Sequence, residues 1–382
     1  MDGLLIYGAY GYTGSLIARE AVAHGGSPVL AGRDGEQVRN LATSLGLDYR
    51  VFDIETDDAS DTDEGDDTPS ASDDDEKTQN TTRLVDQLEP FDVVCNCAGP
   101  FVHTAEPMVE ACLDAGTDYL DINAEFQVFE RLASMDERAT DADITVLPGV
   151  GFDVVTSDCL AAFLASKLSD ATDLSIGIAT SSTVSRGTAK TMVESLGSSG
   201  IIRRRGRLVE VPTAYDTREI DFGPEVGVKP AMTVPWGDVV TAALSTDIAS
   251  VRVYAASTRR TINALKAGAP LESLAEFDPV KSTLERLVDA TMDGPDGSEL
   301  TTGRAVVWGE VTNGTETVTG RLSTPNPYSF TAESAVLAAE RTLDGSVDSG
   351  YQTPATAFGH DFVLECSDVQ RVVNHAHPQS TS

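Results

Sequence analysis

The chain has 382 residues, which is long enough for two domains with ordinary hydrophobic cores. Its 61 acidic and 27 basic residues give a formal net charge of -34, and only six of the basic residues are lysine. A surface this negative repels nucleic acid, and because its charges also repel one another we infer a salt-loving source.

Hydropathy and cysteine usage bear on location. No uninterrupted apolar run is long enough to span a bilayer, and the first expected strand begins too close to Met1 to leave room for a signal peptide. The cysteines lie mostly in predicted strands and helices, which fits reduced thiols in a cytosol. Cys95 and Cys97 lack a second Cys/His pair at ligand spacing nearby. We expect a cytoplasmic protein without a metal site.

The stretch from Leu4 to Gly14 predicts a nucleotide-binding turn. Four apolar residues, typical of a buried parallel strand, lead into Gly8, Gly11 and Gly14, and apolar residues at helical spacing follow. Glycines here permit a tight turn, close approach of the backbone to a pyrophosphate, and close packing of the helix on the strand. The phosphates would lie at the N-terminus of the helix that starts near Tyr12. The spacing G-x-x-G-x-x-G departs from the commoner G-x-G-x-x-G.

A second strand, from Pro28 to Ala31, ends in Gly32-Arg33-Asp34. NAD-selective sites usually place an acidic residue near this point to bind the ribose 2′-hydroxyl, whereas an arginine can pair with a 2′-phosphate. Arg33 therefore predicts NADP(H) in preference to NAD(H). A solvated loop arginine is the alternative interpretation.

A helix from Glu36 to Leu45 and a strand from Tyr49 to Asp53 come next, and Asp53 ends that strand where an adenine ring would lie. From Glu55 to Glu76, twelve of twenty-two residues are acidic and none is basic. Such a segment cannot bury enough apolar surface to fold, so we expect a disordered surface insertion over residues 55–80.

Strands and helices then alternate. We expect strands at 92–98, 118–122 and 144–147, and helices at 104–115 and 126–141. This alternation predicts right-handed crossovers and a parallel sheet, whose ligands bind at the carboxyl ends of the strands. The loops Ala98 to Phe101, Asp121 to Glu125 and Pro148 to Asp153 should gather at that edge.

Beyond a helix at 153–168 the pattern changes to strands with less regular helices. Asn313-Gly314 predicts a hairpin between strands at 305–312 and 316–323, and a helix at 332–342 precedes a short final strand at 361–365. The expected fold is α/β: a Rossmann-type doubly wound parallel sheet in 1–155, completed by 328–382, and an α+β domain with a mixed or antiparallel sheet in 156–327. The second domain would serve substrate binding and, through its sheet edges, a homodimer.

With these elements laid out, the chain resembles the saccharopine dehydrogenase-like oxidoreductases, and the trans-acting enoyl reductase-like branch more than saccharopine reductase itself. The resemblance covers nearly the whole chain outside the acidic insertion. It is carried by Gly8 to Gly14, Ala31 to Arg33, Asn96 to Phe101, Tyr119 to Asp121, Gly151 to Asp153 with Ser157 and Asp158, Pro235 to Asp238, and Thr353 to Ala355.

The resemblance implies an NAD(P)-binding Rossmann domain, a second domain over the nicotinamide, and hydride transfer. The implied cofactor site comprises Gly8, Tyr10, Gly11, Tyr12, Thr13, Gly14, Arg33, Asp53, Ala98, Gly99, Pro100 and Phe101, with Asn96 to Phe101 nearest the nicotinamide. On the substrate side we place Phe152, Asp153, Arg186 and Trp236. Arg186 departs from the smaller residue expected there in the branch with enoyl substrates, which weakens the case for a purely apolar substrate.

Hydride transfer usually needs a proton donor beside the cofactor, and His103, Tyr119 and Asp121 are the candidates. No tyrosine has a lysine four positions on, which excludes the usual general acid of short-chain dehydrogenases. The sequence cannot choose among the three candidates.

Three functions stay open. The first is NADP(H)-dependent reduction of a C=C bond in an enoyl or prenyl lipid-like substrate. The second is saccharopine-type reduction of a C=N bond in an amino acid, and the third is a non-catalytic NADP(H)-binding sensor or scaffold. Arg203, Arg204, Arg205 and Arg207 form an unusual basic cluster, which fits a solvated hairpin, a site for an anionic substrate group, or peripheral contact with an anionic lipid surface.

Overall fold

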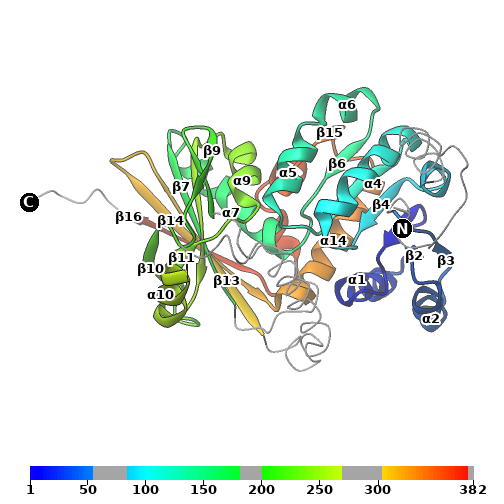
Figure 1. Cartoon of the computed structure of the whole chain (residues 1–382), viewed down its shortest axis with the longest axis horizontal. Coiled ribbons are helices and arrows are strands. Elements are labelled where there is room, and N and C mark those ends of the chain that lie inside the picture. The colour runs from blue at the N-terminus through cyan, green and yellow to red at the C-terminus, as the bar shows by residue number, and fades with distance from the viewer. Residues whose placement is uncertain (55–83, 181–199, 269–302, 377–382) are drawn as a thin grey trace, which may run out of the picture.

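The computed structural model describes residues 1–54, 84–180, 200–268 and 303–376. Two sheets with their own helices lie side by side, and helix α7 (Phe152–Lys167) carries the chain from the first sheet to the second (Figure 1). The expected acidic insertion at 55–80 and the proposed substrate residue Arg186 lie outside the described residues.

In the described part of the chain, the first sheet has seven parallel strands in the order β15-β6-β5-β4-β1-β2-β3. Strand β1, inside the sheet, pairs with β2 on one side and with β4 on the other. The prediction of a doubly wound parallel sheet is therefore confirmed. The strands are β1 (Leu4–Tyr7), β2 (Val29–Gly32), β3 (Tyr49–Val51), β4 (Val93–Asn96), β5 (Asp118–Asp121), β6 (Thr145–Leu147) and β15 (Gly350–Tyr351).

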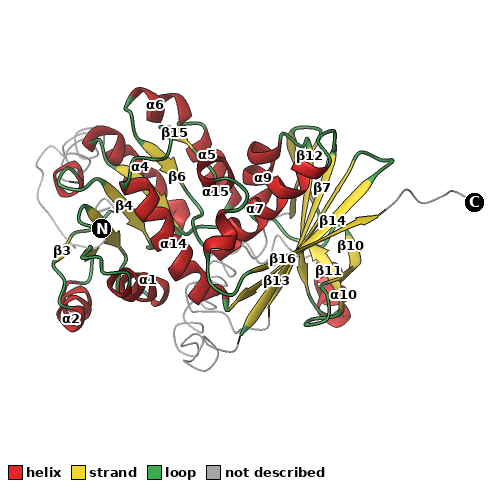
Figure 2. Ribbon diagram, turned by 180° about the vertical axis from the view of Figure 1, so that it is seen from behind, coloured by secondary structure: helices red, strands yellow, loops and turns green. Residues whose placement is uncertain are grey.

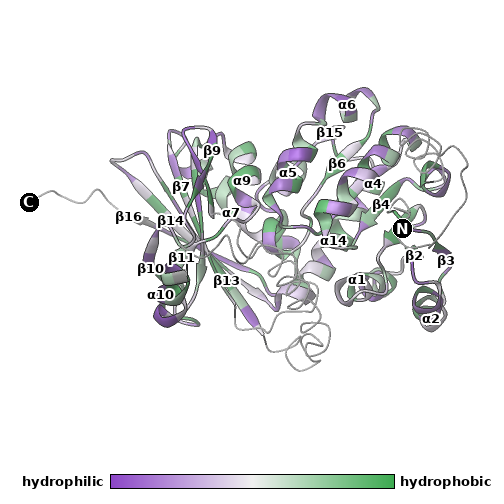
Figure 3. Ribbon diagram, viewed as in Figure 1, coloured by the Kyte–Doolittle hydropathy of each residue, from purple (hydrophilic) through white to green (hydrophobic). Residues whose placement is uncertain are grey.

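Helices pack against this sheet and are ended by local signals. The helices are α1 (Tyr12–Ala23), α2 (Gly35–Leu45), α4 (Phe101–Ala115), α5 (Phe126–Ala133), α6 (Asp136–Asp141), α14 (Pro327–Leu343) and α15 (Pro354–Phe358). Gly46 and Gly116 end α2 and α4 in the left-handed conformation that glycine adopts without strain. Apolar and polar stretches alternate along α4 and α5, as expected of helices with one face on a core (Figure 3).

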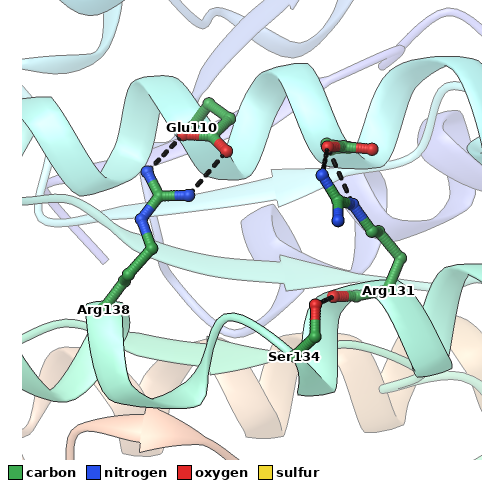
Figure 4. A network of polar contacts seen from close by, with 5 residues as sticks. Glu110, Arg131, Ser134 and Arg138 are labelled. Carbon is green, nitrogen blue, oxygen red and sulfur yellow. Dashed lines mark hydrogen bonds and ion pairs between the residues drawn. The ribbon is translucent and has the colours of Figure 1, made fainter.

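The single helix expected over 126–141 is instead two helices, α5 and α6. The chain turns at Ser134 and Met135, and the side chain of Met135 is buried in the core. Figure 4 shows how both short helices are held to α4: Arg131 and Arg138 reach across to it, and Arg138 binds both carboxylate oxygens of Glu110.

The second sheet is mixed, with the order β10-β11-β12-β7-β13-β14-β16 and with β8 and β9 attached through β12. Strand β12 pairs with β7 in parallel, and the other described pairings are antiparallel. The strands are β7 (Asp173–Thr180), β8 (Gly200–Arg204), β9 (Arg207–Val211), β10 (Thr217–Asp221), β11 (Val228–Thr233), β12 (Ser250–Ala256), β13 (Arg304–Thr312), β14 (Thr317–Pro325) and β16 (Gln370–Ala376). Helices α9 (Asp238–Thr246) and α10 (Arg259–Gly268) accompany them. The hairpin predicted at Asn313-Gly314 is present as β13–β14.

Helix α7 packs closely against the second sheet because two glycines leave room for it. A Cβ atom at Gly309 would lie 2.6 Å from Leu164 Cδ1, and one at Gly320 would lie 3.1 Å from Leu164 Cδ2. Leu160 and Leu164 belong to a core that also includes residues of the first sheet, such as Ile6. The two sheets therefore share one continuous hydrophobic core, with α7 between them (Figure 2).

The C-terminal part of the chain is divided between the two sheets. Helix α14 packs on α1, and its Ser334 donates to the carbonyl of Val150, in the loop after β6, at 2.8 Å. Strand β15 extends the first sheet. The strand expected at 361–365 is instead a 3₁₀ helix (Phe362–Glu365), in which consecutive residues Phe362 and Val363 are both buried, unlike the alternation of a half-buried strand. The last strand, β16, pairs with β14. Residues 370–376 thus belong to the second sheet, although 328–382 as a whole was expected to complete the first domain.

Candidate functional site

The glycine turn between β1 and α1 has no room for a Cβ atom at two of its glycines. Gly8 has a φ of +73°, and a Cβ atom there would lie 2.8 Å from the backbone nitrogen of Ala98. A Cβ atom at Gly14 would lie 2.5 Å from the carbonyl oxygen of Gly8. Gly11 caps α1 and provides no side-chain hydrogen bond to its N-terminus. The backbone here is shaped to approach a phosphate group at the positive end of a helix.

Two tyrosines join the glycine turn to its surroundings. Tyr10 lies across the end of β2, where a Cβ atom at Gly32 would come within 2.6 Å of the Tyr10 ring. Tyr12 makes an edge-to-face contact with Tyr328 of α14, with ring centroids 5.1 Å apart. The neighbouring Thr13 is half-buried in the first turn of α1. The returning helix α14 therefore reaches the predicted cofactor turn.

Arg33 and Asp34, at the carboxyl end of β2, are in different situations. Arg33 is exposed. The carboxylate of Asp34 caps α2: Oδ1 accepts the backbone N–H groups of Glu36 at 3.1 Å and Gln37 at 3.0 Å, and Oδ2 accepts the Gln37 side-chain amide at 2.6 Å. The hydrogen bonds from Gln37 hold the pKa of Asp34 below its usual value. The acid beside Arg33 is thus committed to its own helix.

Asp53 lies near the same edge, beyond the end of β3. Burial raises the pKa of the Tyr7 hydroxyl, and the charge of Asp53 adds to this shift whereas that of Arg33 opposes it. Tyr7 donates its hydroxyl to the carbonyl of Phe52 at 3.2 Å. Arg33 and Asp53 are therefore both within electrostatic reach of the end of β1, where the glycine turn begins.

The loop after β4 is held in place by hydrogen bonds that involve Asn96, which is fully buried. Asn96 Oδ1 accepts the N–H of Ala98 at 3.0 Å, and Asn96 Nδ2 donates to Thr104 Oγ1 at 3.3 Å. Thr104 Oγ1 in turn donates to the carbonyl of Ala98 at 2.6 Å. The peptide bond between Gly99 and Pro100 is cis, and α4 begins at Phe101.

Asp121 ties together the loops after β5 and β6. Its Oδ1 accepts the N–H of Gly149 at 2.8 Å and the backbone and side-chain N–H groups of Asn123 at 3.0 and 2.6 Å. Its Oδ2 accepts the hydroxyl of Tyr119 at 2.8 Å. Both residues are fully buried, and burial raises the pKa of each. Of the three proton-donor candidates, Tyr119 and Asp121 thus shape loops from the interior, whereas His103 is exposed on α4.

Glu125 reaches the same edge from the loop after β5. Its Oε1 accepts the N–H of Phe101 at 3.2 Å, and its Oε2 accepts the N–H of Val102 at 3.0 Å. Sequence reasoning placed Glu125 at this edge and gave it no role. No sequence motif could indicate that Glu125 caps α4, because that helix begins 24 residues earlier in the chain.

The second sheet domain contacts this loop through Trp236 and Gly237. Trp236 forms an isolated antiparallel bridge with Glu125, and the N–H of Gly237 donates to the carbonyl of Ala124 at 2.9 Å. A Cβ atom at Gly237 would clash with the ring of Phe129, so only glycine fits. Trp236, predicted on the substrate side, therefore lies where the two parts of the fold meet.

The other predicted substrate residues begin α7. Phe152 is buried, with its ring edge-on to Phe330 at 6.0 Å and its N–H donating to Thr331 Oγ1 at 3.0 Å. Asp153 is exposed in the first turn of α7. Phe152 is therefore a core residue, whereas Asp153 is open to solvent at the carboxyl edge.

Two acids from the resemblance motifs, Asp158 and Asp238, are buried behind this edge. Asp238 starts α9 and is 1% exposed; burial and the nearby charges of Asp158 and Asp153 raise its pKa to about 7. Its Oδ1 has no hydrogen-bond partner in the part of the chain that the structure describes. Burial raises the pKa of Asp158 to about 6, although Ser245 donates to it at 2.5 Å. Asp158 and Asp238 lay within motifs that carried the family resemblance, but nothing in the sequence marked them as buried.

No group of three or more His, Cys, Asp or Glu side chains in the described ranges is arranged to hold a metal ion, and the five cysteines are unbridged, with Cys95 and Cys97 sulfurs 3.8 Å apart. Within those ranges, no helix combines the length and apolarity needed to cross a membrane.

The arginine cluster lies on the β8–β9 hairpin and is partly occupied within the fold. Arg203 Nε donates to the carbonyl of Val239 at 2.7 Å, and Arg204 donates to the hydroxyl of Tyr215 at 3.0 Å. Arg205 and Arg207 are exposed at and beside the turn. The cluster therefore lies on a hairpin, and two of its four arginines are hydrogen-bonded within the fold.

Comparison with known proteins agrees with this geometry. Residues 4–147, which include the glycine turn, Arg33 and the loops after β4 and β5, match the family model described as the saccharopine dehydrogenase NADP binding domain. This part of the chain is therefore similar to that domain. The resemblance seen in the sequence is thereby confirmed.

Curated relatives and a solved structure extend the comparison. The trans-acting enoyl reductase of Mycobacterium tuberculosis is 28% identical over 241 residues, which are 59% of this chain and 52% of that protein. A "probable mitochondrial saccharopine dehydrogenase-like oxidoreductase" of Arabidopsis thaliana is 31% identical over 170 residues, or 41% of this chain and 33% of that protein. The chain thus spans about half the length of the mycobacterial relative.

The apo saccharopine dehydrogenase (L-Glu forming) of Saccharomyces cerevisiae superposes with a TM-score of 0.64 over 98% of this chain and 99% of that one, at 12% identity. At this identity the match concerns the fold. The saccharopine dehydrogenase-like architecture therefore includes the second, mixed sheet as well as the NADP binding domain.

Proposed function

We propose that the chain is an NADP(H)-dependent oxidoreductase that transfers hydride to the C=C bond of an enoyl or prenyl lipid-like substrate. The NADP binding domain family and the reductase names of the curated relatives support the reaction class. The name of the mycobacterial relative supports an enoyl substrate.

The observation that carries the cofactor proposal is that Asp34 caps α2 whereas the neighbouring Arg33 is exposed. An NAD-selective site needs a carboxylate for the ribose hydroxyls, but the Asp34 carboxylate already caps α2 with three hydrogen bonds. Arg33 is exposed beside it and suits a 2′-phosphate. The glycine turn, in which Gly8 and Gly14 leave no space for a Cβ atom, fits a pyrophosphate.

When bound, the reduced nicotinamide supplies the hydride. The protein's part is to bind and orient: the turn at Gly8 and the N-terminus of α1 would hold the phosphates, and Arg33 the 2′-phosphate. The loop from Ala98 to Phe101, fixed by Asn96 and Thr104, would border the nicotinamide. The second sheet domain would exclude water from the reacting carbon.

Saccharopine-type chemistry requires groups that bind the carboxylates of the substrate. Two groups that could do so are already occupied within the fold, which favours the C=C substrate. The first N–H groups of α4, a natural anion site at this edge, are already bound by the carboxylate of Glu125. The Arg203 guanidinium donates to the carbonyl of Val239 and to that of Gly206. Both groups are thus committed within the fold.

A fluorescence titration with NADPH and NADH, in molar potassium chloride, tests the cofactor proposal. We expect NADPH to bind the tighter, and Arg33→Ala to weaken NADPH by roughly 10- to 100-fold while leaving NADH within about twofold. Arg259→Ala is the matched control, because it removes an arginine that is 74% exposed on α10. Equal affinities in the wild type, or loss of both nucleotides in Arg33→Ala, would contradict the NADP(H) assignment.

Turnover then separates the candidate functions. Loss of NADPH absorbance is followed with a trans-2-enoyl thioester and, separately, with an amino acid plus a 2-oxo acid. We expect oxidation with the enoyl thioester. Oxidation only with the amino acid and 2-oxo acid would favour the saccharopine-type reaction, and tight NADPH binding without oxidation in either assay would favour the sensor or scaffold.

A further inference from the structure

Glu125 caps α4 from another part of the chain. Pro100, which precedes the helix, has no side-chain hydrogen bond to its N-terminus. The Glu125 carboxylate provides the cap instead, accepting the N–H of Phe101 at 3.2 Å and of Val102 at 3.0 Å. A carboxylate at a helix N-terminus is stabilised by hydrogen bonding and by the helix dipole. The start of α4, and the loop that leads into it, therefore depend on where Glu125 lies.

The backbone of the same residue is fixed by the second sheet domain. Glu125 bridges to Trp236, and Gly237 donates to the adjoining carbonyl of Ala124 at 2.9 Å. Gly237 cannot shift toward α5, because the ring of Phe129 occupies the space where its Cβ atom would be. This contact follows β11 and precedes α9, so it belongs to the second sheet domain.

The other connection of Glu125 runs into the first sheet. Its N–H donates to Asn123 Oδ1 at 3.0 Å, and Asn123 donates twice to the buried carboxylate of Asp121. Glu125 thus has three fixed attachments: the second sheet domain, the interior of the first sheet, and the N-terminus of α4.

We propose that Glu125 is a positioning residue for the cofactor, linking the Trp236 segment of the second sheet domain to the loop that borders the nicotinamide. This inference rests on the proposed cofactor site. Glu125 acts on one end of that site, through the loop after β4. Arg33 and Asp53 lie at the other end, after β2 and β3 on the opposite side of β1. Loss of Glu125 should therefore affect the nicotinamide end and spare the adenosine end.

The test compares NADPH with adenosine 2′,5′-bisphosphate, a probe that fills only the adenosine end. For Glu125→Ala we expect NADPH affinity to fall by roughly tenfold, the cost of one capping interaction, and affinity for the bisphosphate to stay within about twofold. Glu125→Gln should recover part of the NADPH affinity, because its amide oxygen still accepts one N–H. A general loss of structure would weaken both ligands together.

Glu110→Ala is the matched control, since Glu110 is a carboxylate on α4 itself and pairs with Arg138 away from the loop (Figure 4). We expect it to leave both affinities unchanged. Gly237→Ala tests the link itself: by displacing the Trp236 segment it should reproduce the selective loss of NADPH affinity.

Equal weakening of both ligands in Glu125→Ala, or no weakening of either, would overturn the positioning role while leaving the proposed function standing. If the wild-type protein binds neither ligand when folded, the proposed cofactor site fails and the positioning role fails with it.

Discussion

The carboxylate of Asp158, on α7, accepts the backbone N–H of Ala355 at 2.8 Å across a sequence separation of 197 residues. Its other oxygen accepts the hydroxyl of Ser245 on α9, and Ser245 and Thr353 hydroxyls lie 2.6 Å apart. One buried carboxylate therefore joins the helix between the sheets, the helix of the second sheet domain and the returning C-terminal segment.

Asp158→Ala should lower the free energy of unfolding by roughly 2 to 4 kcal/mol, because it leaves the buried N–H of Ala355 without its acceptor and removes the hydrogen bond from the Ser245 hydroxyl. Urea unfolding in molar potassium chloride measures this. Asp114→Ala, at an exposed carboxylate on α4, is the control and should change stability by less than about 0.5 kcal/mol. Equal losses of unfolding free energy in the two variants would show that the hydrogen bonds of Asp158 do not stabilise the fold.

Asp238 should make stability depend on pH. Its pKa in the folded protein is about 7, against an ordinary value of 3.8, so the folded state retains this proton where the unfolded chain has lost it. Its contribution to stability is therefore fully present below about pH 4 and is lost as the pH rises to about 7. Between about pH 5 and 8, wild-type stability should fall relative to Asp238→Asn by roughly 2 kcal/mol, measured as paired unfolding curves. Parallel curves would mean that the carboxyl ionises normally.

Gly8→Ala should disrupt the cofactor turn itself. The added Cβ atom would meet the backbone of Ala98 at 2.8 Å, in addition to the strain of a φ of +73°. Gly25→Ala is a matched control, because Gly25 has a φ of +82° and open space around its Cβ position. Both should lose about 1 kcal/mol from backbone strain, but Gly8→Ala should also weaken NADPH binding more than about tenfold. Normal NADPH binding by Gly8→Ala would show that the turn does not contact the nucleotide.

Arg218 stabilises the face of the second sheet opposite α7. Its guanidinium pairs with Glu310 at 2.9 Å and lies 4.7 Å from the centre of the Trp308 ring. Arg218→Ala should cost roughly 1 to 3 kcal/mol and alter tryptophan fluorescence, because it removes a half-buried ion pair and a cation–π contact together. Arg259→Ala breaks the exposed pair with Glu219 and should cost less than about 0.5 kcal/mol. Similar losses in the two variants would contradict this ranking.

The net charge of -34 predicts that stability rises with salt. Raising potassium chloride from about 0.1 M to about 2 M should increase the thermal unfolding midpoint, because screening reduces repulsion among carboxylates. An equal concentration of a neutral osmolyte such as sucrose separates screening from solvent exclusion. If the unfolding midpoint rises with sucrose as much as with salt, the stabilisation does not come from screening of the acidic charges.

The sequence by itself determined the features that depend on local spacing. Apolar runs that ended in Gly8 and Arg33 and alternated with helices predicted the parallel sheet, because buried parallel strands have continuous apolar sequences. Asn313-Gly314 predicted the β13–β14 hairpin for an equally local reason. The short motifs, taken together, also indicated the resemblance to the saccharopine dehydrogenase-like oxidoreductases.

Only the tertiary structure decided which polar groups are buried and what they contact. Nothing near Glu125 in the sequence shows that it caps a helix starting at Phe101, and nothing near Asp238 shows that it is 1% exposed. Tyr119 and Asp121 were proton-donor candidates because they lie near the predicted cleft, and the structure shows that both are fully buried. The same limit applied to β16, whose partner β14 is set by the sheet edge available in space rather than by its own pattern. Burial and long-range hydrogen bonds arise from how distant segments pack, so they are absent from any local pattern of residues.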